Sequence, residues 1–118
     1  MNSFGVQLNE ALRKVEELSR PGGGYNIFPV YTNDLEKLPS VVWTQGESQT
    51  IGAAEGSILV NQNFHISMYS RNLLELERLE RSIRRKLRNV ADSMTTAVDQ
   101  EPPADKVYHR LFTVTLGI

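Results

Sequence analysis

The clearest period in this chain runs through Ile58-Leu59-Val60-Asn61-Gln62-Asn63-Phe64-His65-Ile66-Ser67-Met68-Tyr69. Its even-numbered positions are mainly apolar, and its odd-numbered positions are mainly polar. Side chains alternate between the two faces of a β-strand, so this alternation predicts a strand of about twelve residues with one buried and one wet face.

An amphipathic helix is predicted directly after this strand. Ser70 or Asn72 is its expected cap, and Glu75, three residues after Asn72, completes a capping-box pattern. The apolar residues that follow recur at helical spacing and form one stripe: Leu73, Leu76, Leu79, Ile83, Leu87 and Val90. Acidic residues gather in the first half of the helix and basic ones in the second, which suits the helix dipole.

A second amphipathic helix is predicted before the strands, over residues 3–19. Its apolar residues recur every three or four positions: Phe4, Leu8, Ala11, Leu12, Val15 and Leu18. Arg20-Pro21-Gly22-Gly23-Gly24 ends it, because proline cannot continue a helix and three glycines leave the backbone unrestrained. The glycines follow a helix, whereas a phosphate-binding loop precedes one, so they predict a simple helix stop.

Three further strand signals surround the central one. A short edge strand is expected within 25–31, a compact strand over 40–45 with Trp43 in the core, and a last strand over 107–116. The interval 46–57 has almost no large apolar side chain, so it is predicted to be a long exposed loop. Residues 91–106 have little periodicity and are expected to be a connector.

These elements predict a single α+β domain over residues 1–118. Its expected core is one antiparallel or mixed sheet of about four strands with two helices packed on one face, in the order α-β-β-β-α-β. The other face of the sheet is expected to stay polar. The residues expected on that face are Asn61, Asn63, His65, Ser67, Thr113 and Thr115.

Composition excludes several kinds of protein. Zero cysteines exclude a disulfide scaffold and a thiolate metal site, and a net charge of −1 argues against nucleic-acid binding by the whole surface. No apolar run approaches the roughly 18 residues of a membrane span, so we expect a chain made in the cytoplasm without an anchor. The sequence holds no recognised catalytic, nucleotide-binding or metal-binding motif, and it predicts no enzyme and no cofactor.

Two histidines and one basic segment remain as candidate sites. His65 and His109 both fall on the wet strand faces, and they lack an evident third ligand for a metal. Residues 78–88 hold six cations and one acid, Glu80. This segment is open to three interpretations, namely a solvated helix face, a contact with an acidic protein, or a contact with nucleic acid. The cations are Arg78, Arg81, Arg84, Arg85, Lys86 and Arg88.

The order of elements and several local segments resemble the small tail-terminator and tail-completion proteins of tailed bacteriophages. The resemblance covers nearly the whole chain. The segments that carry it are Ile27-Phe28-Pro29, Leu38-Pro39-Ser40-Val41-Val42-Trp43, Phe64-His65-Ile66-Ser67-Met68-Tyr69-Ser70 leading into 73–87, and the last strand over 108–116.

This resemblance implies a structural virion protein of the tail or neck region, made in the cytoplasm of the bacterial host and without enzymatic activity. Members of the family assemble as a ring, commonly a hexamer, on the last ring of the tail tube. They stop tail polymerisation and present a surface to the head connector. The implied partners are copies of itself, the tail tube protein, a head-completion or neck protein, and DNA that passes through the lumen without sequence-specific binding.

Two parts of the chain gain roles from the resemblance. The loop at 46–57 becomes a flexible arm to the tube or neck, with Gly46, Glu47, Gln49, Thr50 and Glu55 as contact residues. The basic residues of 78–88 become contacts to a neighbouring subunit in the ring or to the lumen. An alternative from a different class is a small nucleic-acid-binding adaptor that uses this basic helix.

Overall fold

The computed structural model of this chain describes residues 3–31, 34, 37–53 and 56–117. The chain begins with a helix, a short 3-10 helix and three strands: α1 (Ser3–Arg13), η1 (Glu16–Leu18), β1 (Ile27–Phe28), β2 (Ser40–Ala53) and β3 (Gly56–Ser70). A second helix and three more strands follow: α2 (Leu73–Leu87), β4 (Ala91–Met94), β5 (Val98–Gln100) and β6 (Tyr108–Gly117). None of the described helices is long and apolar enough to cross a membrane.

The strands form one mixed sheet, which confirms the predicted α+β class. Strand order is β1-β2-β3-β6-β4, and β5 pairs with β6 farther along the same edge. Only β1 and β2 run parallel; the other described pairings are antiparallel. The sheet has six strands where about four were predicted. The two extra strands, β4 and β5, lie in the predicted connector 91–106, and they are too short to give a readable period.

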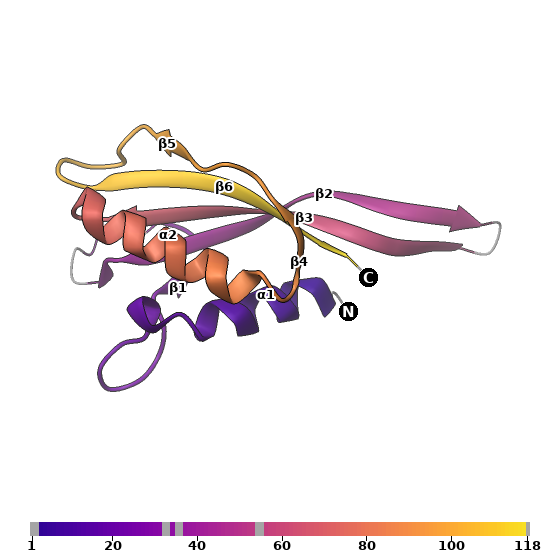
Figure 1. Ribbon diagram of the computed structural model, residues 1–118, viewed down its shortest axis with the longest axis horizontal. Helices are drawn as coiled ribbons and strands as arrows, with labels where there is room; N and C mark the ends of the chain where they lie inside the picture. Colours follow the sequence, from indigo (N-terminus) through magenta and orange to yellow (C-terminus); the bar gives the residue numbers. More distant parts are fainter. Residues whose placement is uncertain (1–2, 32–33, 35–36, 54–55, 118) are drawn as a thin grey trace.

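Both helices cover the same face of the sheet, as predicted, and the main core lies between these two layers (Figure 1). Apolar residues from α1, η1, α2, β2, β3 and β6 form it. The largest fully buried side chains there are Phe64, Phe112, Leu8, Leu12, Leu18, Ile66, Met68, Leu76, Leu79, Ile83, Leu87 and Leu116. Trp43 packs against the core, with its ring edge-to-face to Phe64 at 5.5 Å between centroids.

The opposite face of the sheet is polar only in part. Asn63, His65, Thr113 and their neighbours lie on it, as predicted, at least partly exposed. At one end, however, a second small core buries Leu38, Val42, Tyr69 and Val107. Segments flanking β2 and β6 fold back over this end, so the prediction of a wholly polar face is wrong there. The sequence pattern missed the second core because its members come from short segments far apart in the chain.

The two helices differ in how well their ends were predicted. The predicted helix 3–19 stops at Arg13, and Val15 takes an extended conformation before η1. Val15 and Leu18 are still fully buried, because a 3-10 turn continues the spacing of three that the apolar pattern requires. The cap of α2 is confirmed, since Asn72 Oδ1 accepts a hydrogen bond from the Glu75 backbone N–H at 2.7 Å.

Residues 46–57, predicted to be an exposed loop, contribute mainly to two strands. β2 continues to Ala53 and β3 begins at Gly56, and the pair keeps an antiparallel register with two irregularities. Polar residues suffice here because the ladder needs only backbone partners, whereas the sequence prediction looked for apolar side chains. The hairpin extends well beyond the helices, in a molecule that measures 52 × 31 × 23 Å (Figure 1).

Candidate interaction surfaces

The projecting part of the hairpin is called the arm here: residues 46–53 of β2 and 56–62 of β3. Within the described residues, β1 pairs only with Val41 and Val42 of β2, and β6 reaches β3 only from Asn61 onward. The arm is therefore a two-stranded ribbon along most of its length. Gly46, Glu47, Gln49 and Thr50, predicted as contact residues in a loop, lie in β2. Glu55 lies outside the described residues.

A buried glutamine organises the base of the arm. The register of β2 against β3 shifts between Gln45 and Ser48, so Gly46 and Glu47 form a bulge. Gln62 is 6% exposed, and its side-chain amide donates to the carbonyl oxygens of Gly46 at 2.8 Å and Glu47 at 3.3 Å. A bulge disrupts the ladder locally, and Gln62 supplies donors to the carbonyls there. This explains a polar side chain at an otherwise apolar position of β3.

Glycine is required at the bulge by a close approach. A Cβ atom at Gly46 would lie 2.6 Å from His65 Nε2. The His65 ring is held in place, because its Nδ1 lies 3.0 Å from Thr113 Oγ1 across the sheet. Farther out, the Asn61 side-chain amide donates to Gln49 Oε1 at 2.7 Å. These contacts hold the base of the arm against β3 and β6, while the flexibility of the arm stays a prediction.

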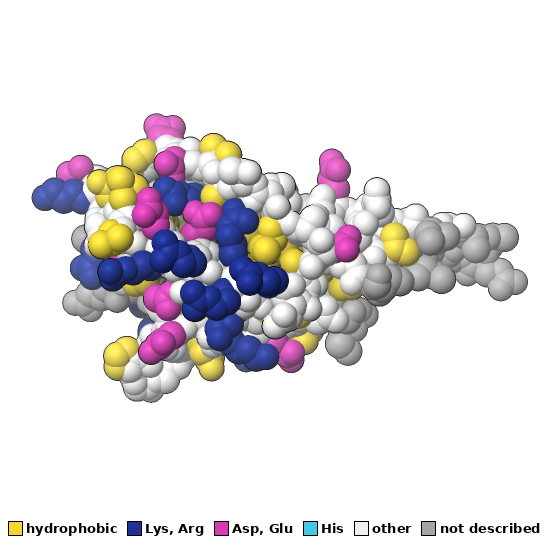
Figure 2. Space-filling view, in the orientation of Figure 1, with side chains coloured by type: hydrophobic (Ala, Val, Ile, Leu, Met, Phe, Trp, Pro, Cys, Tyr) yellow, Lys and Arg dark blue, Asp and Glu magenta, His cyan; other side chains and the backbone are white. Residues whose placement is uncertain are grey.

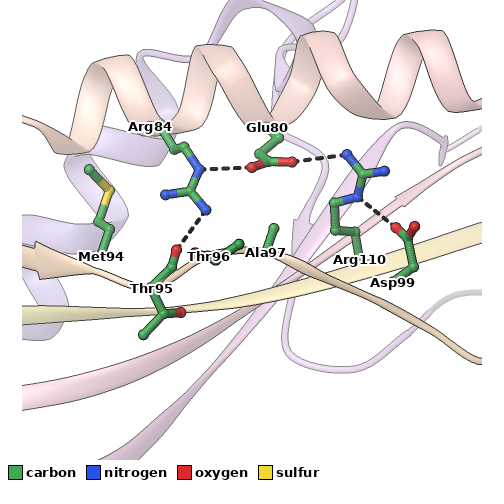
Figure 3. Close-up of a pocket in the computed structure, with 8 residues that line it drawn as sticks. All are labelled: Glu80, Arg84, Met94, Thr95, Thr96, Ala97, Asp99 and Arg110. Atoms are coloured by element: carbon green, nitrogen blue, oxygen red, sulfur yellow. Dashed lines mark hydrogen bonds and ion pairs between the residues drawn. The ribbon is translucent and has the colours of Figure 1, made fainter.

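One of the predicted basic residues, Arg84, is engaged inside the protein. Its guanidinium donates to Glu80 at 2.8 Å and to the Thr95 carbonyl oxygen at 2.7 Å (Figure 3). The guanidinium also lies over the Phe112 ring, 4.4 Å from its centroid. Arg110 of β6 bonds both Glu80 at 3.0 Å and Asp99 at 2.7 Å. We call Glu80, Arg84, Asp99 and Arg110 the charge cluster.

The charge cluster ties α2 to the edge of the sheet. The pKa of Arg110 is raised, chiefly because its guanidinium donates to Asp99 and further because it donates to Glu80. The side chains of Arg110 and Glu80 are only 15% and 19% exposed, so these charges are partly desolvated and depend on one another. The i,i+4 spacing of Glu80 and Arg84 is visible in the sequence; the link to Asp99 and Arg110 needed the β5–β6 register.

Four other arginines form a row on the outside of α2. Arg78, Arg81, Arg85 and Arg88 follow at spacings of three, four and three residues and are all exposed, so they share the helix face opposite the buried stripe. The row spans about 15 Å at 1.5 Å per residue. We call it the arginine ridge; Figure 2 shows Lys and Arg side chains gathered over the helical body. Lys86 is also exposed and, with Arg85, lines a hollow that Glu10 of α1 and Lys14 share.

The arginine ridge is electrostatically unfavourable by itself. Like charges three and four residues apart destabilise a helix by about 0.2–0.5 kcal/mol per pair. The helix dipole offsets part of this cost near the C-terminal end, at Arg85 and Arg88. None of the four ridge arginines has an ion-pair partner within the part of the chain that the structure describes. The ridge is thus available to an anionic surface outside this subunit.

The two histidines lie apart on the same sheet. The two histidines could be neighbours only if β3 paired with β6, and the two strands do pair. However, His65 faces Thr113 and His109 faces Tyr69. The His109 ring stacks on Tyr69 at 4.4 Å between centroids, and burial lowers its pKa. Burial also raises the pKa of Tyr69. Among the described residues, no group of three or more His, Cys, Asp or Glu side chains is placed to hold a metal ion.

The sequence was compared with models of known protein families and with curated proteins, and neither comparison found a match.

Proposed function

We propose that this chain is a structural virion protein that assembles with copies of itself into a ring on the end of a bacteriophage tail tube. There it stops tube polymerisation and forms the surface that meets the head-completion or neck protein. DNA passes through the ring without sequence-specific contacts. The proposal contains no catalytic step, no cofactor and no membrane contact, and it takes the ring to be a hexamer.

The arm is the observation that carries this proposal. β2 and β3 have 14 and 15 residues, against a typical strand length of about 5–6. An isolated two-stranded ribbon is at best marginally stable in water. A long ribbon that projects from the body is therefore best explained by a partner that completes it. A ring neighbour, the tube or a neck protein each offers such a partner.

The arginine ridge supports the same proposal. Four exposed arginines on one helix face favour contact with an anionic surface, which an acidic face of a neighbouring subunit or the phosphates of passing DNA would supply. The first helical segment exposes acids as well, Glu10 and Glu16, together with the cations Arg13 and Lys14. A ring requires two different patches on each subunit that fit each other.

Tail assembly in the absence of this chain tests the proposal. Phage carrying a stop codon early in this reading frame should produce tail tubes of irregular length that fail to join heads, seen by electron microscopy. Purified protein added to such tubes should bind one end and halt their growth. Tails of normal length that join heads without this protein would overturn the proposal.

A nucleic-acid-binding adaptor remains the second candidate, because the arginine ridge presents exposed cations along one helix. It predicts binding to duplex DNA that weakens steeply with salt. Replacing Arg85 and Arg88 by Ala should then reduce affinity more than tenfold. Arg84→Ala is unsuitable for this test, since Arg84 holds the charge cluster together. Equal affinity of the wild-type and the double variant for DNA would exclude the adaptor.

A further inference from the structure

We propose that the outer edge of β2 at the base of the arm pairs with the outer edge of β4 in a second copy of this chain. The pairing would join neighbouring subunits into one continuous antiparallel sheet. This inference rests on the proposed self-assembly and names the surfaces that carry it. It follows from three features of the sheet. Two strand edges are open, the two edge strands run in opposite directions, and the two edges lie at the same height along the strands.

The first feature is a pair of open edges on opposite sides of the sheet. Beyond Val42, the outer edge of β2 has no partner strand within the described residues. On the other side, β4 and β5 pair only with β6. Open edges expose backbone donors and acceptors and invite pairing with another chain.

Neither edge carries lysine, arginine or proline, although both strands have a register irregularity, at Gly46 and Glu47 in β2 and between Ala91 and Ser93 in β4. In natural proteins, edge strands commonly carry lysine, another charged residue or a proline, which hinders pairing with another chain. Residues 43–53 contain no Lys, Arg or Pro and one acid, Glu47. Residues 91–100 contain no Lys, Arg or Pro and two acids, Asp92 and Asp99, of which Asp99 is held by Arg110. Backbone pairing is thus left open on both sides.

The second feature is strand direction. β2 is antiparallel to β3, β3 to β6, and β6 to β4, so β2 and β4 run in opposite directions. Two copies placed side by side in the same orientation therefore bring β2 of one beside β4 of the next in an antiparallel arrangement. Such a contact uses different surfaces on the two copies, and it closes into a ring when the rotation between them allows.

The third feature is the level of the two edges along the strand direction. Met94 of β4 faces Val114, Val114 faces Phe64, and Phe64 faces Gln45. β4 is thus level with the base of the arm, where β2 has no outer partner. β5 is level with Val42, through Leu111 and Ser67, where β1 already covers β2. β4 is therefore the edge that fits.

Charge sets the register of this pairing. With no shift along the strands, the exposed acids Glu47 and Asp92 of adjacent copies would come close together. Like charges directly opposite each other destabilise a strand pair. We expect a shift by two residues toward Val42, because this shift separates the acids and brings Thr44 opposite Ser93, which lies on the same face of the sheet.

A proline at the open edge tests the inference. The Val41 N–H donates to Asn26, away from β3, so by strand alternation the Gln45 N–H also points to the open edge. Gln45→Pro removes that donor without removing a bond to β3. We expect unchanged thermal unfolding of the monomer and at least a tenfold loss of ring formation on tail tubes. Gln45→Ala, which keeps the donor, should assemble like the wild-type.

Cysteine cross-linking tests the same contact without relying on proline. The chain has no cysteine, so single variants Thr44→Cys and Ser93→Cys give a clean background. Both positions lie on the polar face of the sheet, because Thr44 faces His65 and Ser93 faces Thr115. Mixed rings should form disulfide dimers that contain one of each variant. Rings that assemble without such dimers, together with normal assembly of Gln45→Pro, would overturn the strand pairing while leaving the proposed function intact. Wild-type protein that neither self-associates nor caps tubes would overturn both.

Discussion

β3 crosses two regions of the molecule, and its two halves have different surroundings. Phe64, Ile66 and Met68 lie under both helices and are fully buried. The half from Gly56 to Gln62 belongs to the arm and pairs mainly with β2. One strand thus serves a two-layer core at one end and a ribbon at the other. Its alternation alone does not mark the boundary, because burial also needs a second layer that only the body supplies.

The charged residues of α2 also differ in their surroundings. Arg84 and Arg85 are adjacent in sequence, yet Arg84 completes the charge cluster and Arg85 stands in the arginine ridge. The helix rotates successive side chains by about 100°, so one turns toward β4 and β5 while the next faces outward. The role of each cation depends on what lies beside its helix face.

The largest expected effect comes from a body residue. Phe64→Ala removes a fully buried ring that packs against Trp43, and a substitution of this type costs about 3–5 kcal/mol of unfolding free energy. Asn61→Ala, in the arm, should cost less than about 1 kcal/mol because only two exposed hydrogen bonds to Gln49 are lost. Urea unfolding of both variants measures the contrast, and similar losses would remove the distinction between arm and body.

Next in size is the loss of the charge cluster. Arg84→Met removes the bonds to Glu80 and to the Thr95 carbonyl oxygen, and we expect a loss of about 1–3 kcal/mol. Arg85→Met is the matched control on the exposed face, with an expected change within about 0.5 kcal/mol. Thermal unfolding of the two variants distinguishes the engaged arginine from the free one. A larger loss for Arg85→Met would contradict the assignment.

A smaller effect is expected at the base of the arm. Gln62→Leu leaves the carbonyl oxygens of Gly46 and Glu47 without their side-chain donor, at a cost of about 1 kcal/mol. Hydrogen exchange should accelerate in residues 44–50, while the amides of α2 keep their protection. Unchanged exchange throughout β2 would mean that Gln62 does not hold the arm in place.

The smallest effect is a pH dependence at the second core. Burial lowers the pKa of His109, so between its folded and unfolded pKa values the unfolded chain binds more protons. The contribution of neutral His109 to the free energy of unfolding should therefore be complete above about pH 6.5 and be lost as the pH drops below that value. His109→Phe should flatten this part of the profile and keep the stacking on Tyr69. If the variant keeps the same slope, the pH dependence comes from other groups.

Part of the candidate interaction surfaces could be predicted from the sequence. The cations of residues 78–88 and the polar interval 46–57 both stand out in the sequence. Five of the six cations are exposed, as are residues 47–50 and 52. Two features were not readable. In the sequence, Gln62 is a polar residue among apolar even-numbered positions, and its role is explained only by the bulge opposite it. The role of Arg110 is explained only by its contacts with Glu80 and Asp99. Each of these contacts joins residues at least 11 positions apart in sequence.

The sequence by itself determined the two amphipathic helices, the central strand and the placement of both helices on one face. These follow from periods of two and of three to four residues, which record a buried face whatever covers it. Only the tertiary structure decided that Asn72 and not Ser70 caps α2, that residues 46–53 pair with β3 as an arm, that a second core covers one end of the far face, and that Arg84 differs from Arg85. Those outcomes depend on backbone pairing and on long-range contacts, which leave no local period in the chain.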